Sequence, residues 1–307
     1  MTIRKADYMN VAVSRNDERR WKNIAFLSLI LLITGIAMAE YFTLKEIEML
    51  ATTHLDRAFF FMVVVGFLAQ MVDGALGMGY GVISTTLLLS GGLNPAVISG
   101  SIHTAEMFSS GASGFSHYRF GNVNKKLFKT LLIPGVLGAI AGAVLLGTLG
   151  AKYADWIRPV LSAYTFFLGV KILLNAFKKD VKPKKVKRAG WLAGAGGFLD
   201  SFGGGGWGPL VTSTLISKGR SPKYVIGSVS LTEFFVTMAS ALTFFIILGV
   251  SHLGTIIGLI VGGVIAAPLA ARLAGKLPVR KMFIGVGIIV LISSIRIIWN
   301  SLDKLVF

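Results

Sequence analysis

The chain of 307 residues contains no cysteine, so disulfides, thiolate metal sites and cysteine nucleophiles are all excluded. Charged residues are also scarce: they make up 15% of the chain, whereas soluble domains carry about 25%. This composition argues against a soluble enzyme and against a disordered chain. The sequence also lacks a Gly-x-x-x-x-Gly-Lys-[Ser/Thr] nucleotide loop and the hydrolase motifs His-Glu-x-x-His and Gly-x-Ser-x-Gly. ATP-driven and hydrolytic chemistry are therefore not expected.

What the chain does contain is mostly apolar: 54% of its residues are hydrophobic, the mean hydropathy is +0.72, and there are 37 glycines. In a soluble protein, the formal charge of +17 would suggest nucleic-acid binding. Here the Lys and Arg residues form short clusters between apolar runs, a pattern typical of the cytoplasmic loops of membrane proteins. We therefore expect a multi-pass protein of the cell (inner) membrane that contacts lipid and binds no nucleic acid.

A membrane-spanning helix needs about 20 mostly apolar residues. The chain has seven segments that approach this length, and two further apolar regions that a glycine-rich stretch interrupts. Each half of an interrupted region has about 10–15 residues, a length that favours re-entrant or discontinuous helices. The seven predicted spans are 24–39 with its flanks, 97–115, 130–149, 157–177, 224–248, 254–271 and 282–301. The interrupting stretches, with their apolar flanks, are 73–81 (58–72 and 82–90) and 200–208 (189–199 and 209–217).

The first hydrophobic segment has two interpretations. A basic stretch, an apolar run and the small residues Ala37-Met38-Ala39 resemble a signal peptide with its cleavage site. The polar lead that precedes the apolar run, 1–23, is long for a signal peptide, so we favour a retained first helix. Residues 1–57 are then a cytoplasmic tail, a first transmembrane helix and an external loop.

The two interrupted regions match each other when the chain is aligned with itself, without gaps, so that Asp73 falls on Asp200. Segments 73–113 and 200–240 share 15 identities in 41 positions, more than a common membrane composition explains. We interpret them as parts of two internal repeats, 58–177 and 189–307, joined by the basic cytoplasmic linker 178–188. The other matched pairs include Tyr80 with Trp207, Thr85 with Thr212, Glu106 with Glu233, and Gly77, Gly79 and Gly81 with Gly204, Gly206 and Gly208.

The Lys and Arg residues predict how the segments are oriented. If each interrupted region enters and leaves on the same side, the loops of one side hold 24 Lys and Arg and those of the other side hold 5. If each region crosses once, the totals are 15 and 14. The positive-inside rule therefore favours re-entrant regions, a cytoplasmic N-terminus and an external C-terminus.

With this topology, repeat 58–177 starts outside and repeat 189–307 starts inside, so the two are inverted about an axis in the membrane plane. The predicted fold class is an all-α polytopic membrane protein with about seven full spans plus two re-entrant, broken-helix hairpins in two inverted repeats. Inverted repeats with interrupted helices at matching positions are a mark of secondary transporters, in which substrate binds near the midplane between the breaks.

Each break offers the chemistry of an anion site. The half-helix that follows it begins with free N–H groups at the positive end of its dipole, and glycines allow the backbone to approach a ligand closely. Two such ends facing each other bind an anion without a buried Lys or Arg. The alternatives are close helix packing for the glycines, core packing for the aromatic residues, and bonding to their own helix for the hydroxyls. The candidate substrate-binding residues are Gly77, Gly79, Tyr80, Gly81, Thr85, Ser101, Gly204, Gly206, Trp207, Gly208, Thr212 and Ser228.

Five ionisable residues lie in apolar stretches, where such residues are functional candidates. We expect Asp73 and Asp200 to accept hydrogen bonds from the loop amides that follow them and so to hold the breaks in shape. His103 and Glu106 share a helix face, and either is a candidate for proton coupling. For Glu106 and Glu233, bracing of the helices is an equal alternative. No catalytic residue, metal ion or cofactor is expected.

These features resemble the TauE/SafE sulfite exporter family over about residues 58–302. The resemblance implies passive or proton-linked movement of a small anion such as sulfite or sulfoacetate, commonly as export, and it assigns no role to His103. It rests on the Asp-plus-Gly stretches 73–81 and 200–208, the connectors Asn94-Pro95 and Ser221-Pro222, and the Gly-Ser-x-x-x-x-Glu runs 100–106 and 227–233.

The favoured function is a secondary transporter for sulfite, an organosulfonate or another small sulfur-containing anion. An anion channel on the same scaffold and a carrier of a non-sulfur organic anion stay open as alternatives. An enzyme is not expected, and a non-transporting subunit that binds a partner through linker 178–188 is a weaker interpretation than a positive-inside loop. A homodimer is compatible with the size of the chain, although no motif indicates one.

Overall fold

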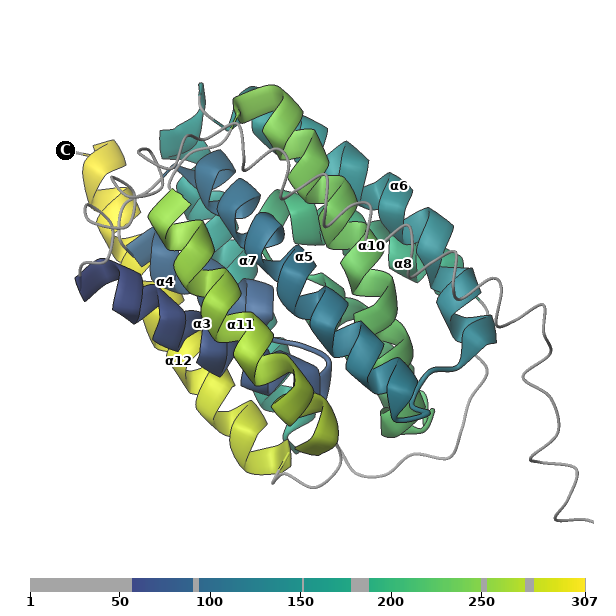
Figure 1. The fold of residues 1–307 in the computed structure, drawn as a ribbon. Coiled ribbons are helices and arrows are strands. Elements are labelled where there is room, and N and C mark those ends of the chain that lie inside the picture. The colour runs from purple at the N-terminus through teal and green to yellow at the C-terminus, as the bar shows by residue number, and fades with distance from the viewer. Residues whose placement is uncertain are drawn as a thin grey trace, which may run out of the picture. The chain divides into compact units, whose positions relative to one another are not determined.

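The computed structural model describes residues 57–90, 94–150, 152–177, 188–249, 253–273 and 279–306. The predicted first helix at 24–39 and most of linker 178–188 lie outside the described residues. The described part is helical and contains no β-strand. Its elements in chain order are α3 (Arg57–Leu76), α4 (Tyr80–Ser90), α5 (Pro95–Arg119), α6 (Lys125–Leu149), α7 (Ala154–Asn175), α8 (Ala189–Gly203), the π-helical turn η2 (Trp207–Thr212), α9 (Ser213–Ser217), α10 (Pro222–Leu248), α11 (Leu253–Leu273) and α12 (Val279–Val306) (Figure 1).

Six of the described helices are long and apolar enough to cross a membrane: α3, α6, α7, α10, α11 and α12. Five of them coincide with spans predicted from the sequence. The sixth predicted span, 97–115, lies in α5, which has 25 residues but carries a row of serines that lowers its hydropathy. The chain is thus an all-α, multi-pass membrane protein, as its composition indicates.

The first interrupted region differs from the prediction in length. Its first half is α3, whose 20 residues exceed the predicted half-helix 58–72 and suffice in length to span a bilayer. The helix continues through Asp73 to Leu76 because the first glycine with positive φ, which ends the regular spiral, is Gly77. The matching helix α8 likewise continues through Asp200 to Gly203 and ends at Gly204, which also has a positive φ.

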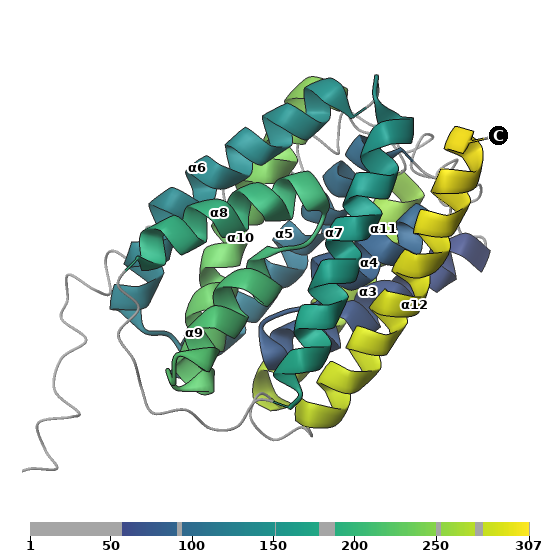
Figure 2. The same cartoon turned by 180° about the vertical axis from the view of Figure 1, so that it is seen from behind.

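Helices of one predicted repeat pack against helices of the other. α3 runs parallel to α11 and α6 parallel to α8, and these are corresponding pairs if the halves are related by symmetry. α6 and α8 lie side by side in both views of the bundle (Figures 1 and 2). Glycines allow the close approach, as small residues do between membrane helices. The contacts that establish the directions are Gly66–Leu259, Gly74–Ala270, Pro134–Gly190 and Gly142–Phe198.

α5 and α10 cross antiparallel through the middle of the bundle. Near the centre of both helices, the hydroxyl oxygens of Ser110 and Thr237 lie 3.3 Å apart and share a hydrogen bond. These two residues are equivalent in the alignment that places Asp73 on Asp200. Equivalent residues touch where a two-fold axis passes between them, so this is the contact expected of inverted repeats. The repeat relation itself stays a prediction.

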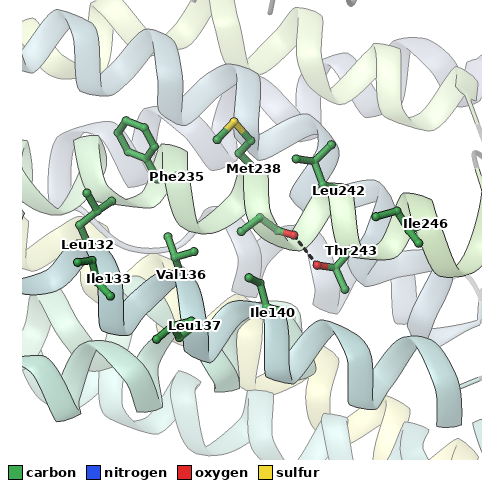
Figure 3. Close-up of a pocket in the computed structure, with 11 residues that line it drawn as sticks. Leu132, Ile133, Val136, Leu137, Ile140, Phe235, Met238, Leu242, Thr243 and Ile246 are labelled. Carbon is green, nitrogen blue, oxygen red and sulfur yellow. Dashed lines mark hydrogen bonds between the residues drawn. The ribbon is translucent and has the colours of Figure 1, made fainter. Parts of the chain in front are cut away.

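A shallow groove of about 480 Å³ lies between α6 and α10 (Figure 3). Its lining is almost entirely aliphatic and also includes Phe235 and Met238. The polar residue Thr243 donates its hydroxyl hydrogen to the Ala239 carbonyl of its own helix. A groove of this composition suits lipid acyl chains, and it has none of the polar groups that an anion needs.

Candidate functional site

Glycine geometry shapes both breaks. Gly77 and Gly79 in the first break and Gly204 in the second have φ values of 69°, 131° and 66°, which residues with a side chain rarely adopt. Beyond the first break, α4 begins at Tyr80. Beyond the second break, the chain restarts as the π-helical turn from Trp207, a form often found at functional sites. The predicted glycine stretches are therefore real interruptions of the helices.

The two breaks face each other directly. Gly81 lies against the backbone of Gly204, and its equivalent Gly208 lies against the backbone of Gly77 and Met78. A Cβ atom on Gly81 would approach the Gly204 carbonyl oxygen to 2.8 Å, closer than carbon and oxygen pack. The glycines at these positions thus allow the two loops to meet backbone to backbone.

Two threonines that match in the internal alignment, Thr85 and Thr212, contact the backbone of the opposite break. The Thr85 hydroxyl donates a hydrogen bond to the Gly204 carbonyl across the interface. Its equivalent, Thr212, places its methyl group against Gly77, while its buried hydroxyl has no protein partner. In this conformation Thr85 holds the second break, whereas the hydroxyl of Thr212 is available to a ligand.

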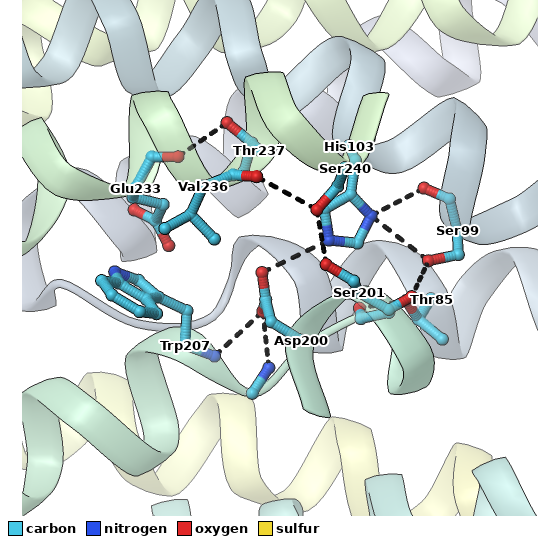
Figure 4. Close-up of polar contacts among 12 residues, drawn as sticks. Thr85, Ser99, His103, Asp200, Ser201, Trp207, Glu233, Val236, Thr237 and Ser240 are labelled. Atoms are coloured by element: carbon cyan, nitrogen blue, oxygen red, sulfur yellow. Dashed lines mark hydrogen bonds and ion pairs between the residues drawn. The ribbon is translucent and has the colours of Figure 1, made fainter. Parts of the chain in front are cut away.

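The leading aspartates bind the amides that follow the breaks, as expected. The Oδ1 atom of Asp200 accepts hydrogen bonds from the N–H groups of Gly206 at 2.7 Å and Trp207 at 2.9 Å (Figure 4). The carboxyl group of Asp73 lies near the N–H of Tyr80 in the first break. The first N–H groups after the second break are thus already engaged by a carboxylate of the chain itself.

Four buried carboxyl groups lie close together, two from each half of the chain. Asp73 lies within hydrogen-bonding range of Glu233 on α10, and Asp200 lies near Glu106 on α5. None of these four residues is more than 3% exposed. Two carboxylates cannot hydrogen-bond without a proton between them, and an unpaired charge is costly to bury. Burying both groups of the Asp73–Glu233 pair in their charged forms would therefore be costly.

His103 adds a fifth group, and only on one side. Its Nε2 atom lies 3.3 Å from Oδ2 of Asp200, and its Nδ1 atom lies 2.7 Å from the carbonyl oxygen of Ser99 (Figure 4). The residue equivalent to His103 in the second repeat is Ser230, whose buried hydroxyl has no protein partner. The histidine thus makes the two halves of the site chemically different.

His103, Glu106 and Asp200 are close enough to hold one cation together, since their ligand atoms lie within 4.8 Å of one another. The 3.3 Å contact between His103 and Asp200 is already the geometry of an ion pair.

Other residues that the sequence predicts to bind substrate are buried among protein groups in this structure. Trp207 and Tyr80 are fully buried, and Trp207 packs among apolar side chains of α6, α8 and α10. Ser101 is buried on α5. The Ser228 hydroxyl accepts a hydrogen bond from the N–H of Asn124 at 2.7 Å, so it braces the turn before α6 in this conformation.

Several polar residues at the site were not singled out from the sequence. The Ser99 hydroxyl donates to the Ser201 carbonyl, Ser201 and Ser240 bond each other, and the buried Tyr164 hydroxyl lies against Gly206 without a protein partner. Ser99 lies one helical turn before His103, which is a signal that helix periodicity offers. The contribution of Tyr164 from α7 has no local signal, because it depends on how distant helices pack.

Comparison with known proteins agrees with this architecture. The family described as sulfite exporter TauE/SafE matches residues 62–297. "Probable membrane transporter protein YtnM" of Bacillus subtilis (strain 168) is 42% identical over 193 residues, 60% of this chain and 63% of YtnM. "Probable membrane transporter protein ORF9" of Sinorhizobium sp is 27% identical over 190 residues, 62% of this chain and 67% of that protein.

The match thus covers less than two thirds of the length of YtnM, and no solved structure matches the chain significantly. The names of the family and of both relatives describe transport, which fits the expectation that the protein is not an enzyme. The family match covers well over half of the chain, including both breaks and the buried acidic cluster. The chain therefore belongs to the TauE/SafE sulfite exporter family of membrane transporters.

Proposed function

We propose that the protein is a secondary transporter that moves a small anion out of the cell, with sulfite, an organosulfonate or another small sulfur-containing anion as substrate. The substrate binds between the two glycine breaks. Transport proceeds by alternating access, in which one repeat rocks against the other around that site. Movement of the anion is linked to protons through the buried acidic cluster.

One observation carries this proposal. The carboxylate of Asp200, itself an oxyanion, is bound by two consecutive backbone N–H groups at 2.7 and 2.9 Å, at the point where the two breaks meet. Backbone N–H groups at such a turn bind a sulfite or sulfonate oxygen by the same chemistry. No Lys or Arg side chain takes part in the described hydrogen bonds of the breaks, so the polar backbone supplies the donors.

The choice of a sulfur anion is supported by the description of the family as sulfite exporters. YtnM and the ORF9 protein are named as transporters without a substrate. The topology proposed with this function places the N-terminus and the lysine-rich start of α6 inside the cell and the C-terminus outside, following the Lys and Arg distribution.

The test is flux in proteoliposomes of purified protein, offered sulfite, sulfoacetate, sulfate and thiosulfate with and without an imposed pH gradient. Saturable flux of one sulfur anion that responds to the gradient is expected, together with its loss in Asp200→Asn. The matched control is Asp155→Asn, which removes an exposed carboxylate at the start of α7 and is expected to transport normally.

Two results would change the assignment. Flux that does not saturate and is not stimulated by substrate on the opposite side would indicate an anion channel. Absence of flux for all four anions, from protein shown to be folded, would contradict a sulfur substrate and favour a carrier of a non-sulfur organic anion.

A further inference from the structure

Asp200 has partners on two opposite sides. Its Oδ1 atom binds the N–H groups of Gly206 and Trp207 in the second break, and its Oδ2 atom lies 3.3 Å from His103 Nε2 on α5. The residue is only 3% exposed, so water does not compete for it. One carboxylate thus joins the anion-binding backbone of the break to the histidine across the site (Figure 4).

The donors and acceptors around His103 require a proton in its contact with Asp200. The carbonyl oxygen of Ser99 can only accept, so His103 Nδ1, 2.7 Å away, must carry a hydrogen and donate it. If Nε2 carried none, it would face Oδ2 of a carboxylate as a second acceptor. The contact between the two side chains therefore needs a proton between Nε2 and Oδ2, and the pair as a whole is then electrically neutral.

In this conformation, a carboxylate of the chain itself occupies the donors with which the second break would bind an oxyanion. The two N–H groups that an anion would use are occupied by Asp200. A third donor is unused: the Tyr164 hydroxyl is buried, has no protein partner, and lies against Gly206 at the same turn. A substrate anion that reached this turn would find one free donor and two that a carboxylate already holds.

We propose that Asp200 is a built-in substitute for the transported anion: the substrate displaces it from the N–H groups of Gly206 and Trp207, and one proton enters with each anion to neutralise the displaced carboxyl group beside His103. This inference rests on the proposed function and specifies its coupling. The Tyr164 hydroxyl then donates to the substrate. On release, the proton leaves and the carboxylate returns to the N–H pair.

The charges around the site make the proton obligatory. Besides His103, the titratable groups that face Asp200 are Glu106 on α5, Asp73 on α3, Glu233 on α10 and Tyr164 on α7. None of these adds a positive charge. An anion that entered without a proton would leave the buried cluster with an uncompensated negative charge, at high cost.

The first break has no counterpart of the contact between His103 and Asp200. There the partner of Asp73 is the carboxyl group of Glu233, and the position equivalent to His103 is Ser230, which does not titrate near neutral pH. The proton switch therefore belongs to the second break alone, and one proton per anion is expected.

The test is titration calorimetry of sulfite into detergent-purified protein in two buffers of different ionisation enthalpy, which counts the protons taken up per anion bound. The protonation of sulfite itself is common to all variants, so differences between variants report the protein. Wild type and Asp155→Asn are expected to take up about one more proton per sulfite than Asp200→Asn. Because one more proton is bound with each anion, their affinity should fall by up to about tenfold per unit rise in pH relative to that of the variant.

Asp200→Ser, whose hydroxyl can still accept a hydrogen bond from the break but carries no charge, is the second variant, should Asp200→Asn fail to fold, and the same loss of proton uptake is expected. Sulfite binding by folded Asp200→Asn or Asp200→Ser with as many protons as wild type would overturn the inference while leaving the transporter assignment intact. Failure of wild type to bind sulfite would instead contradict the proposed function on which the inference rests.

Discussion

At the scale of single residues, the acidic groups and the glycines of the breaks have separable roles. The carboxylate of Asp200 satisfies backbone N–H groups that would otherwise be orphaned in a membrane interior. Glu106 and Glu233 come from the crossing helices α5 and α10 and face the aspartate of the opposite repeat. Of the four buried carboxyl groups beside the proposed anion site, Asp200 contacts backbone donors and His103, whereas one oxygen in each of the other three has no hydrogen-bond partner.

Gly206→Leu is expected to abolish transport while leaving the protein in the membrane. Any Cβ at this position would meet the Tyr164 hydroxyl and would lie 3.0 Å from the Asp200 nitrogen, so the turn that presents the N–H pair cannot keep its shape. Flux in proteoliposomes, with the amount of membrane-inserted protein measured in parallel, tests this. Wild-type flux from the variant would remove the second break from the substrate pathway.

His103→Gln is expected to slow transport. The two ring nitrogens of His103 contact the Ser99 carbonyl oxygen and Asp200 Oδ2 at the same time, and the single amide nitrogen of glutamine cannot reach both. The measurement is the initial flux rate of wild type and variant in proteoliposomes with equal amounts of inserted protein. An unchanged rate would reduce His103 to a packing residue between α5 and α8.

At the scale of elements, glycine contacts set how closely the helices approach. On α6, a Cβ at Gly138 would collide with the carbonyl oxygen of Gly194 on α8, whereas a Cβ at Gly285 on α12 would have no atom within 4 Å. Packing against backbone leaves no flexible side chain to move aside. The α6–α8 contact is therefore intolerant of even one methyl group.

Gly138→Ala should lower the free energy of unfolding by about 1–3 kcal/mol, the cost of overpacking a tight interior. The corresponding drop in the thermal midpoint is on the order of 2–10 °C in detergent. Gly285→Ala is the control and should leave the midpoint unchanged or raise it, because alanine favours helix over glycine. Equal midpoints for Gly138→Ala and wild type would show that α6 and α8 can separate without loss of stability.

At the scale of the whole molecule, the cross-packing of the two halves agrees with an inverted pair. The contacts of α3 with α11 and of α6 with α8 are parallel, those of α5 with α10 are antiparallel, and Ser110 meets its equivalent Thr237. Each half therefore depends on the other for its neighbours. Under the proposed alternating access, a motion that opens the site moves one set of helices against the other.

The absence of native cysteine allows a direct test of topology. Lys126→Cys, at the start of α6, and Lys152→Cys, before α7, introduce single exposed thiols at the two ends of α6. A membrane-impermeant maleimide is expected to label Lys152→Cys in intact cells and Lys126→Cys only in inverted vesicles, because the basic loop faces the cytoplasm. Labelling of both from the same side would contradict the proposed crossing of α6.

Much of the fold and of the site could be predicted because the relevant signals are local or repeated along the chain. Apolar length predicted the positions of α6, α7, α10, α11 and α12, and the internal alignment matched Asp73 with Asp200 and Glu106 with Glu233. The length of α3 was underestimated, because glycine content alone does not show which glycine takes the positive φ that ends a helix. That choice depends on the loop that packs against it.

The sequence by itself determined that this is an all-helical membrane protein with two glycine breaks and a set of ionisable residues in apolar stretches, because hydropathy, glycine and charge act within one or two helical turns. Only the tertiary structure decided which side chains meet. The pairing of His103 with Asp200, and the approach of Tyr164 to Gly206, join segments that are far apart in the chain. Such contacts depend on how helices of the two halves cross, and crossing is set by the shape of whole packed surfaces.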